Sequence, residues 1–196
     1  TYTLRVSGLE ASAGYTVKAY VQTTEKRYEG AEQSFTTAAA PENVSIAAVK
    51  AAGRQVAQGG ISAYAENHII TGTVVASYVE PVVEETPDED GAEAKASAAT
   101  KSVSVEETKV AIVDGTEKDC GITLYLEAGT NSYAVGDKIS VRVKDAQVSH
   151  TSSGAVYLTP LTSGITLVSN DNQVAPVTIN HTELADYESM YVTIEN

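Results

Sequence analysis

Residues with metal-binding side chains are present, but their spacing does not build a metal site. The segment DEDG at residues 88–91 carries carboxylates of the kind that bind calcium, and it lacks the ligand spacing of an EF-hand loop. Acidic runs of this kind are usually solvated loops. His68, His150 and His181 lie far apart and do not show the i, i+4 spacing of paired histidine ligands. The sequence therefore predicts no metal site and no cofactor.

Nucleophilic and acid–base chemistry have equally little support. Cys120 is the only cysteine and has no base beside it, so a partly buried, unreactive thiol is expected. Asp114 and Asp119 lie at the two ends of the segment DGTEKD and could form a glycosidase-like pair of carboxylates. Turns in which carboxylates accept backbone N–H groups are far commoner. Without a hydrolase, nucleotide-binding or metalloprotease motif, we expect that the protein is not an enzyme.

The composition favours strands and an acidic surface. The chain has no Trp, one Phe and one Met, but eleven Tyr, and Tyr, Val and Thr suit pleated, half-buried surfaces. The formal net charge is −13, which opposes binding to nucleic acids and to anionic membrane surfaces. No run is long and apolar enough for a transmembrane helix, and no signal peptide is recognised, so direct membrane insertion is not expected and an exported form would be trimmed.

The first forty residues predict an antiparallel meander of three strands, at residues 1–9, 15–22 and 30–37. The segment YTLRVSGLEASAGYTVKAYVQTTEKRYEGAEQSFTT resembles the last three strands of a fibronectin type III domain. In that family a tyrosine hydrogen-bonds back to the chain to close a corner, and the resemblance gives this role to Tyr15. The first four strands have no counterpart here, so one apolar face lacks its cover. We expect self-association through residues 1–37, or packing of this sheet onto the rest of the chain.

That apolar face is predicted from the alternation of side chains along the three strands. Its members are Tyr2, Leu4, Val6, Tyr15, Val17, Ala19, Val21 and Phe35. After a linker at residues 38–42, a short helix is predicted at 45–53. Ser45 is a good N-cap, Ile46 and Val49 share one face, and Gly53 can end the helix.

Further strands are predicted beyond residue 60, with Gly72 placed where a barrel strand must bend. Their ranges are 68–78, 108–113, 122–126, 139–144, 155–161 and 165–168. The segments HIITGTVVAS, VAIVDGTEKDCGITLYL and YAVGDKISVRV resemble an uncharacterised OB-like domain family in surface lipoproteins of Bacteroidetes. This resemblance covers roughly residues 43–196. It implies export and attachment at the cell surface as an outer-membrane lipoprotein, or a periplasmic location, and it implies no activity.

The predicted fold class is all-β, with an immunoglobulin-like (fibronectin type III-like) partial sheet followed by a small OB-like β-barrel and one short helix. We expect the partial sheet at residues 1–40 and the barrel at 41–180. An acidic, alanine-rich insertion at residues 80–101 is predicted to be a mobile loop, because it has too few apolar groups to pack. The segment TELADYESMYVTIEN, within residues 181–196, resembles a lead-in to a following module.

The outer strand faces of the barrel offer the one indication of a binding site. If the alternation holds, Tyr125, Arg142, Lys144 and Tyr157 point away from the core. OB barrels bind oligosaccharides or oligonucleotides on such a face, although tyrosine and arginine also cover exposed sheets that bind nothing.

The favoured hypothesis is a non-enzymatic modular surface protein that functions in adhesion or carbohydrate binding, with a glycan or another surface protein as its partner. The alternative is a structural spacer that presents a distal domain. A single-stranded nucleic-acid binder is disfavoured by the net charge of −13 and the scarcity of Trp and Phe. An exposed aromatic platform in a groove would distinguish a glycan binder from a spacer.

Overall fold

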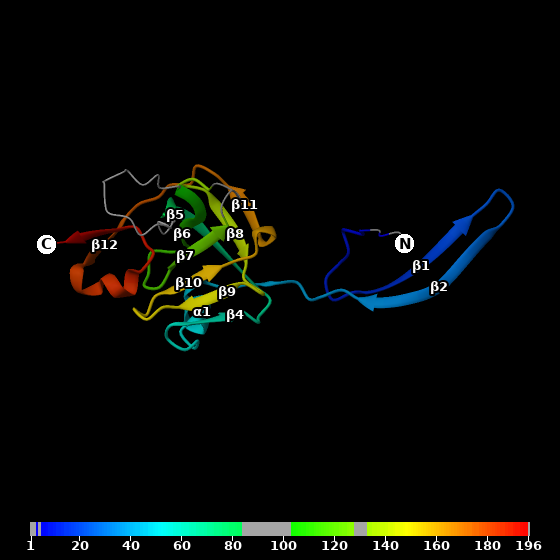
Figure 1. Ribbon diagram of the computed structural model, residues 1–196, viewed down its shortest axis with the longest axis horizontal. Helices are drawn as coiled ribbons and strands as arrows, with labels where there is room; N and C mark the ends of the chain where they lie inside the picture. Colours follow the sequence, from blue (N-terminus) through cyan, green and yellow to red (C-terminus); the bar gives the residue numbers. More distant parts are fainter. Residues whose placement is uncertain (1–2, 4, 84–102, 128–132, 196) are drawn as a thin grey trace, which may run out of the picture. The chain divides into compact units, whose positions relative to one another are not determined.

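The computed structural model describes residues 3, 5–83, 103–127 and 133–195, and the chain divides into two compact units, residues 1–41 and 42–196 (Figure 1). Strands account for 47% of the structure and helices for 11%, so the all-β class is confirmed. The division falls one residue after the expected boundary between residues 40 and 41.

The first unit contains a β-hairpin. Strand β1 (Gly14–Gln22) pairs antiparallel with β2 (Arg27–Thr36), and Thr23 N donates to Lys26 O across the turn at 2.9 Å. The expected strand at residues 1–9 is wrong for its described part, because residues 3 and 5–9 form no strand. The chain turns at Ser12, whose φ is 54°, and Ser12 N donates to Ala38 O at 3.0 Å. The described residues before Ser12 therefore add no third strand to the hairpin.

Tyr15 makes the hydrogen bond predicted for it. Its hydroxyl accepts from Glu10 N at 2.8 Å, and its ring stacks on Phe35 with centroids 5.9 Å apart. The predicted buried face is nevertheless exposed, since Val17, Val21 and Phe35 are 52%, 65% and 45% exposed. A two-stranded hairpin has no second layer to cover such a face. Tyr2 and Leu4 lie outside the described residues.

The second unit begins with the predicted helix. Helix α1 spans Ile46–Gly53, and Ser45 Oγ accepts from Ala48 N at 3.2 Å as an N-cap. Ile46 and Val49 are fully buried, as their shared face predicts. A second cap comes from far along the chain, because Asp114 Oδ2 accepts from Ile46 N at 2.7 Å. Strand β3 (Glu42–Asn43) lies just before the helix and pairs with β5.

One nine-stranded sheet forms most of this unit, in the order β11-β8-β5-β6-β7-β10-β9-β4, with β3 attached to β5. The strands not yet bounded are β4 (Gly60–Ala63), β5 (His68–Val83), β6 (Val103–Val113), β7 (Gly121–Glu127), β8 (Lys138–Arg142), β9 (Gln147–His150), β10 (Val156–Thr159) and β11 (Ile165–Ser169). A 3-10 helix, η1 (Thr162–Gly164), precedes β11. Strands β3, β4 and β9 were not predicted.

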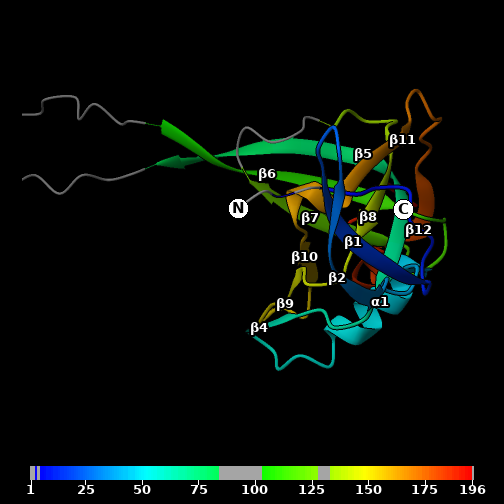
Figure 2. The ribbon, with the colours of Figure 1, turned by 90° about the vertical axis from the view of Figure 1, so that its right-hand side faces the viewer.

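Strand β5 changes partners along its length. Its first part pairs with β8 over residues 69–73, and its second part pairs with β6 over residues 73–83. Figure 2 shows β5 and β6 running side by side beyond the other strands. Gly72 lies at the changeover, where an added Cβ would be only 3.0 Å from the carbonyl oxygen of Val113. The sequence predicts that Gly72 lies where the strand bends and another backbone comes close, and the approach of Val113 agrees with this.

The expected closed barrel is wrong, because the described strands form an open path with β11 and β4 at its ends. Strands β8 and β9 follow each other through residues 143–146 instead of pairing. In that turn Val143 N donates to His68 O at 3.0 Å, and Asp145, with φ 65°, donates its N–H to Tyr64 O at 2.9 Å. Strands β8 and β9 are thus joined by the chain and not by hydrogen bonds between strands. The strands still surround one apolar core.

The acidic insertion is shorter than predicted. Strand β5 continues to Val83 and β6 begins at Val103, so residues 80–83 belong to a strand. Residues 84–101, with the DEDG segment, lie outside the described residues. The prediction of a mobile loop therefore applies only to that part and stays a prediction.

The C-terminal residues pack on the sheet and belong to the second unit. Strand β12 (Val177–Asn180) and β13 (Val192–Glu195) form a parallel pair around a 3-10 helix, η2 (His181–Tyr187). Their contact with β7 is very close, since a Cβ on Gly121 would lie 2.7 Å from Ser189 O and 2.8 Å from Glu188 O. The segment therefore packs against β7 of the sheet, and its role as a lead-in to a following module stays a prediction.

Candidate functional site

The most distinctive surface feature is a groove on the outer face of β5, β6, β7 and β10, which we call the tyrosine groove. Its volume is about 360 Å³, within the range of about 300–1,000 Å³ that is usual for small-molecule sites. It is lined by Val75, Ala76, Tyr78, Ala111, Thr123, Tyr125, Tyr157, Glu188, Ser189, Met190 and Tyr191. Four of these residues are tyrosines.

Strand register places the tyrosines of the groove beside one another. Tyr78 lies opposite Lys109, and Lys109 lies opposite Tyr125, on three consecutive strands. The Lys109 ammonium is 5.9 Å from the Tyr78 ring and 5.0 Å from the Tyr125 ring. Tyr157 follows on the parallel neighbour β10, and its ring lies 5.1 Å from that of Tyr125 at an angle of 54°. The result is a row across four strands, in which Lys109 lies between the rings of Tyr78 and Tyr125, and the ring of Tyr157 lies beside that of Tyr125.

The C-terminal segment forms the opposite wall. The hydroxyls of Thr123 and Ser189 are 2.8 Å apart and share a hydrogen bond. Val177 N donates to Tyr191 O at 2.9 Å, which ties the wall to β12. Tyr191 itself is 50% exposed, so its ring remains available to a ligand.

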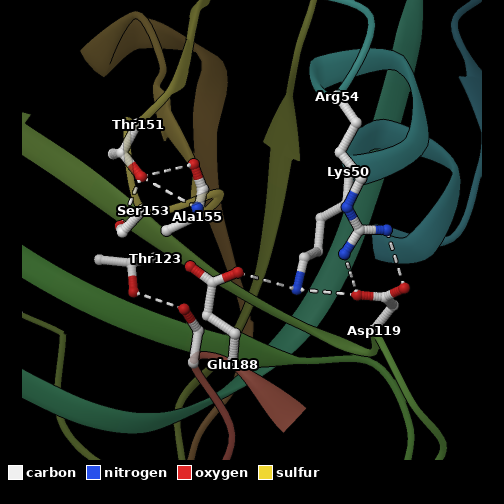
Figure 3. Close-up of polar contacts among 9 residues, drawn as sticks. Lys50, Arg54, Asp119, Thr123, Thr151, Ser153, Ala155 and Glu188 are labelled. Atoms are coloured by element: carbon white, nitrogen blue, oxygen red, sulfur yellow. Dashed lines mark hydrogen bonds and ion pairs between the residues drawn. The ribbon is translucent and has the colours of Figure 1, made fainter. Parts of the chain in front are cut away.

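An ion cluster around one buried lysine holds this wall against the rest of the unit (Figure 3). We call Lys50, Arg54, Asp119 and Glu188 the Lys50 cluster. The fully buried Lys50 Nζ lies 3.2 Å from Asp119 Oδ1 and 3.4 Å from Glu188 Oε2. Arg54 binds both oxygens of Asp119. The Lys50 ammonium therefore joins three elements, which are helix α1, the turn between β6 and β7, and the C-terminal wall.

These surroundings set the protonation of two groups. The Arg54 hydrogen bond, aided by the nearby Lys50 charge, lowers the pKa of Asp119 from 3.8 to about 2. Burial raises the pKa of the Tyr157 hydroxyl, and the negative charge of Glu188 adds to this effect. Tyr157 is thus a neutral hydroxyl at physiological pH and can donate a hydrogen bond to a ligand.

The four residues proposed as a binding face separate into two pairs. Tyr125 and Tyr157 come together in the tyrosine groove. Arg142 lies on β8 and donates to Asn67 Oδ1 at 3.2 Å, and Lys144 lies in the turn after β8; neither lines the groove. Alternation along β7, β8 and β10 predicts correctly that Tyr125, Arg142 and Tyr157 lie on outer strand faces, but it cannot say which strands are neighbours.

The other reactive residues have structural contacts. Asp114 caps α1 and Asp119 binds Arg54, so the two carboxylates have separate structural partners. Cys120 is partly buried, and burial together with the charge of Asp114 raises its thiol pKa, which disfavours the thiolate.

His68 and His150 have separate partners. His68 Nδ1 is 2.8 Å from the Tyr64 hydroxyl, and His150 Nδ1 is 2.8 Å from Val56 O. Among the described residues, no group of three or more His, Cys, Asp or Glu side chains could hold a metal ion.

No protein-family model, curated protein or solved structure matches the chain. Within the described part of the chain, no helix has the length and apolar character needed to cross a membrane.

Several residues of the tyrosine groove and of the Lys50 cluster were missed by sequence reasoning. Tyr78 could have been found, because it ends the predicted strand 68–78. Lys50 also had a local signal, since it follows Ile46 by four residues and shares its buried helix face. Glu188 and Tyr191 had no such signal, because contacts with residues far away in sequence place them at the groove.

Proposed function

We propose that the second unit is a carbohydrate-binding module and that the tyrosine groove is its binding site. The observation that carries the proposal is the set of four tyrosines around one groove, with the rings of Tyr125 and Tyr157 only 5.1 Å apart. Sugar rings have an apolar C–H face that packs on aromatic rings, and hydroxyl edges that need polar partners. The groove offers both kinds of group, since Thr123, Ser189 and Glu188 line it beside the tyrosines.

An OB-like arrangement of the second unit accompanies this proposal. It is supported by the long β5 shared between β8 and β6, and by the parallel pairing of β7 with β10. The ring of paired strands is not closed, because β8 and β9 are consecutive along the chain but do not pair. In OB domains, ligands bind across the outer strand face, where the tyrosine groove lies here.

The setting we propose is a modular, exported surface protein in which the first unit is fibronectin type III-like. The Tyr15 hydrogen bond to Glu10 N supports that likeness, since it is the contact by which such a tyrosine closes a corner. Protease treatment of intact source cells tests the location. Cleavage of this chain while a cytoplasmic marker stays intact is the expected result, and full protection would argue against surface exposure.

The two other functions have less support. A pure spacer has no need of an aromatic groove, whereas four tyrosines line this one. Single-stranded nucleic acid could stack on tyrosines, but a net charge of −13 opposes the phosphate backbone. We expect no binding of homopolymeric single-stranded DNA at physiological salt.

The proposal is tested by a glycan array followed by calorimetric titration of the best ligand. Tyr125→Ala and Tyr157→Ala should each weaken binding by about fivefold or more, because each removes a stacking surface worth about 1 kcal/mol or more. Tyr20→Ala is a matched control, since Tyr20 is 58% exposed on the hairpin of the other unit. Arg142→Ala is a second control, because Arg142 does not line the groove.

Thermal melts of all four variants establish that the fold persists. A full array without any bound glycan, or a bound glycan that is indifferent to both groove variants, would refute the proposal.

A further inference from the structure

A second hollow lies beside the tyrosine groove, and we call it the polar hollow. It also has a volume of about 360 Å³. The outer face of β5, the turn after β6 and the segment that leads into β12 form its walls. Its lining includes Thr71, Thr73, Asp114, Lys138, Gln173 and Tyr191.

The two hollows share a boundary. Val75, Met190 and Tyr191 line both of them, so the hollows are adjacent and separated only by these side chains. The boundary is firmly held, because the backbone before Met190 leaves no room for a Cβ at Gly121, and Val177 N donates to Tyr191 O. The half-exposed ring of Tyr191 therefore stands where a ligand would pass from one hollow to the other.

The polar hollow differs in chemistry from the tyrosine groove. Thr71 and Thr73 bring hydroxyls from β5, Gln173 brings an amide and Lys138 an ammonium group. Within the described residues, no hydrogen bond or ion pair involves the side chain of Lys138 or of Gln173. These groups can donate to, and the amide can also accept from, the hydroxyls of a sugar.

The charges of the two hollows disfavour an acidic sugar. Glu188 lines the tyrosine groove and Asp114 lines the polar hollow, so each hollow contains a carboxylate. The chain as a whole has a net charge of −13. Glu188 is paired with Lys50, and Asp114 shares the polar hollow with Lys138, so the two hollows offer a uronate no net positive charge, and the overall charge of the chain opposes it.

We propose that the tyrosine groove and the polar hollow are two subsites of one extended site, which binds a linear, neutral oligosaccharide across Tyr191. The inference rests on the carbohydrate-binding function proposed above and specifies its ligand class. Sugar units in the tyrosine groove stack on the aromatic rings, and units beyond Tyr191 hydrogen-bond in the polar hollow. Because one chain engages both subsites, affinity depends on chain length.

The test is a calorimetric titration of the full chain with oligosaccharide series from the monosaccharide to the hexasaccharide. The probes are β-1,4-linked glucose and xylose, α-1,4-linked glucose, β-1,4-linked mannose, and galacturonate oligomers as the acidic comparison. For the neutral series that binds, we expect the tetrasaccharide to bind at least about tenfold more tightly than the monosaccharide, which corresponds to about 1.4 kcal/mol. Galacturonates of equal length should bind at least about tenfold more weakly.

Two variants locate the second subsite. Thr73→Val and Lys138→Met remove polar groups of the polar hollow, so they should weaken binding of the hexasaccharide several-fold and leave binding of the shortest ligand unchanged. Tyr125→Ala should weaken binding at every length. Lys144→Met is the control for loss of a positive charge, because Lys144 lines neither hollow.

The possible failures are distinguishable. Equal affinity for short and long chains, or equal weakening of both by the polar-hollow variants, would overturn the extended site while the proposed carbohydrate binding stands. Binding of galacturonates as tight as that of the neutral series would overturn the neutral ligand class. If no oligosaccharide of any length binds, the proposed function and this inference both fail.

Discussion

At the residue scale, Lys50 supplies the buried positive charge that the carboxylates of the Lys50 cluster surround. A buried ammonium is costly to desolvate, and here two carboxylates compensate for it. Glu188 in turn needs Lys50. Its buried Oε1 has no hydrogen-bond partner among the described residues, and its other oxygen faces the Lys50 ammonium. Loss of Lys50 would leave Glu188 as an uncompensated charge, whereas Asp119 would keep Arg54.

Lys50→Met should therefore destabilise the protein by about 3 kcal/mol, since breaking a buried pair from one side leaves a buried charge. The double variant Lys50→Met with Glu188→Gln should recover part of this loss, because the remaining partner is then neutral. Denaturant unfolding of the single and double variants measures both effects. A single variant as stable as the wild type would show that Glu188 is not buried against Lys50.

Asp119 should make stability depend on pH in the acidic range. Its pKa in the folded state is about 2, below its ordinary value of 3.8, so its contribution is complete above the ordinary value and is lost as pH falls through about 2. The contribution is about 2 kcal/mol. Asp119→Asn removes it, and asparagine tolerates the left-handed φ of 63° at this position.

Between about pH 5 and pH 2 the wild type should therefore lose about 2 kcal/mol more of its free energy of unfolding than Asp119→Asn does. Urea melts across this range measure the difference. Parallel pH profiles for the two proteins would contradict the role of Asp119.

At the scale of elements, docking of the C-terminal segment on β7 completes both hollows. Gly121 makes this possible because it has no side chain, and the carbonyl oxygens of Glu188 and Ser189 occupy the space of its missing Cβ. The Thr123–Ser189 hydrogen bond and the pair Lys118–Asp186, at 2.8 Å each, lie on either side of the contact. A small residue in a strand thus sets the position of Tyr191.

Gly121→Ala should lower stability by about 1–3 kcal/mol, because the added methyl group must displace a backbone segment. The same change should increase hydrogen exchange in residues 186–191 and weaken glycan binding, since one wall of each hollow moves. Gly14→Ala is the control, because a Cβ there meets nothing within 4 Å. Unchanged exchange in residues 186–191 would show that the segment accommodates the methyl group without moving.

At the scale of the whole molecule, the two units differ in how well they bury their apolar residues. The second unit has one continuous core, whereas the hairpin of the first unit exposes Val17, Val21, Tyr28 and Phe35. The opposite hairpin face is polar and contains the ion pair Lys18–Glu29 at 2.8 Å. Such a two-sided strand pair associates readily through its apolar face.

We therefore expect the full chain to self-associate through residues 1–37. Light scattering should give a mass above that of the monomer for the full chain and a monomer for a version that starts at Pro41. Val17→Lys should also weaken association, whereas Tyr20→Lys should not, because Tyr20 lies on the face that bears Lys18 and Glu29. A monomeric full chain would exclude association through this face.

Features that depend on neighbours in the sequence were predictable. The N-cap at Ser45 and the apolar spacing of Ile46 and Val49 are sufficient for α1. Alternation along β7 correctly places Leu124 inside and Tyr125 outside, because a strand repeats every two residues. The all-β class follows from several such segments.

Only the tertiary structure decided which of these segments lie side by side. Tyr78, Tyr125, Tyr157 and Tyr191 come from four elements, and no local period encodes that they share one groove. The open ends of the sheet likewise follow from the turn between β8 and β9, which periodicity does not reveal. The physical reason is that alternation specifies which face of a strand is buried, whereas the partner of that strand is set by contacts between residues far apart along the chain.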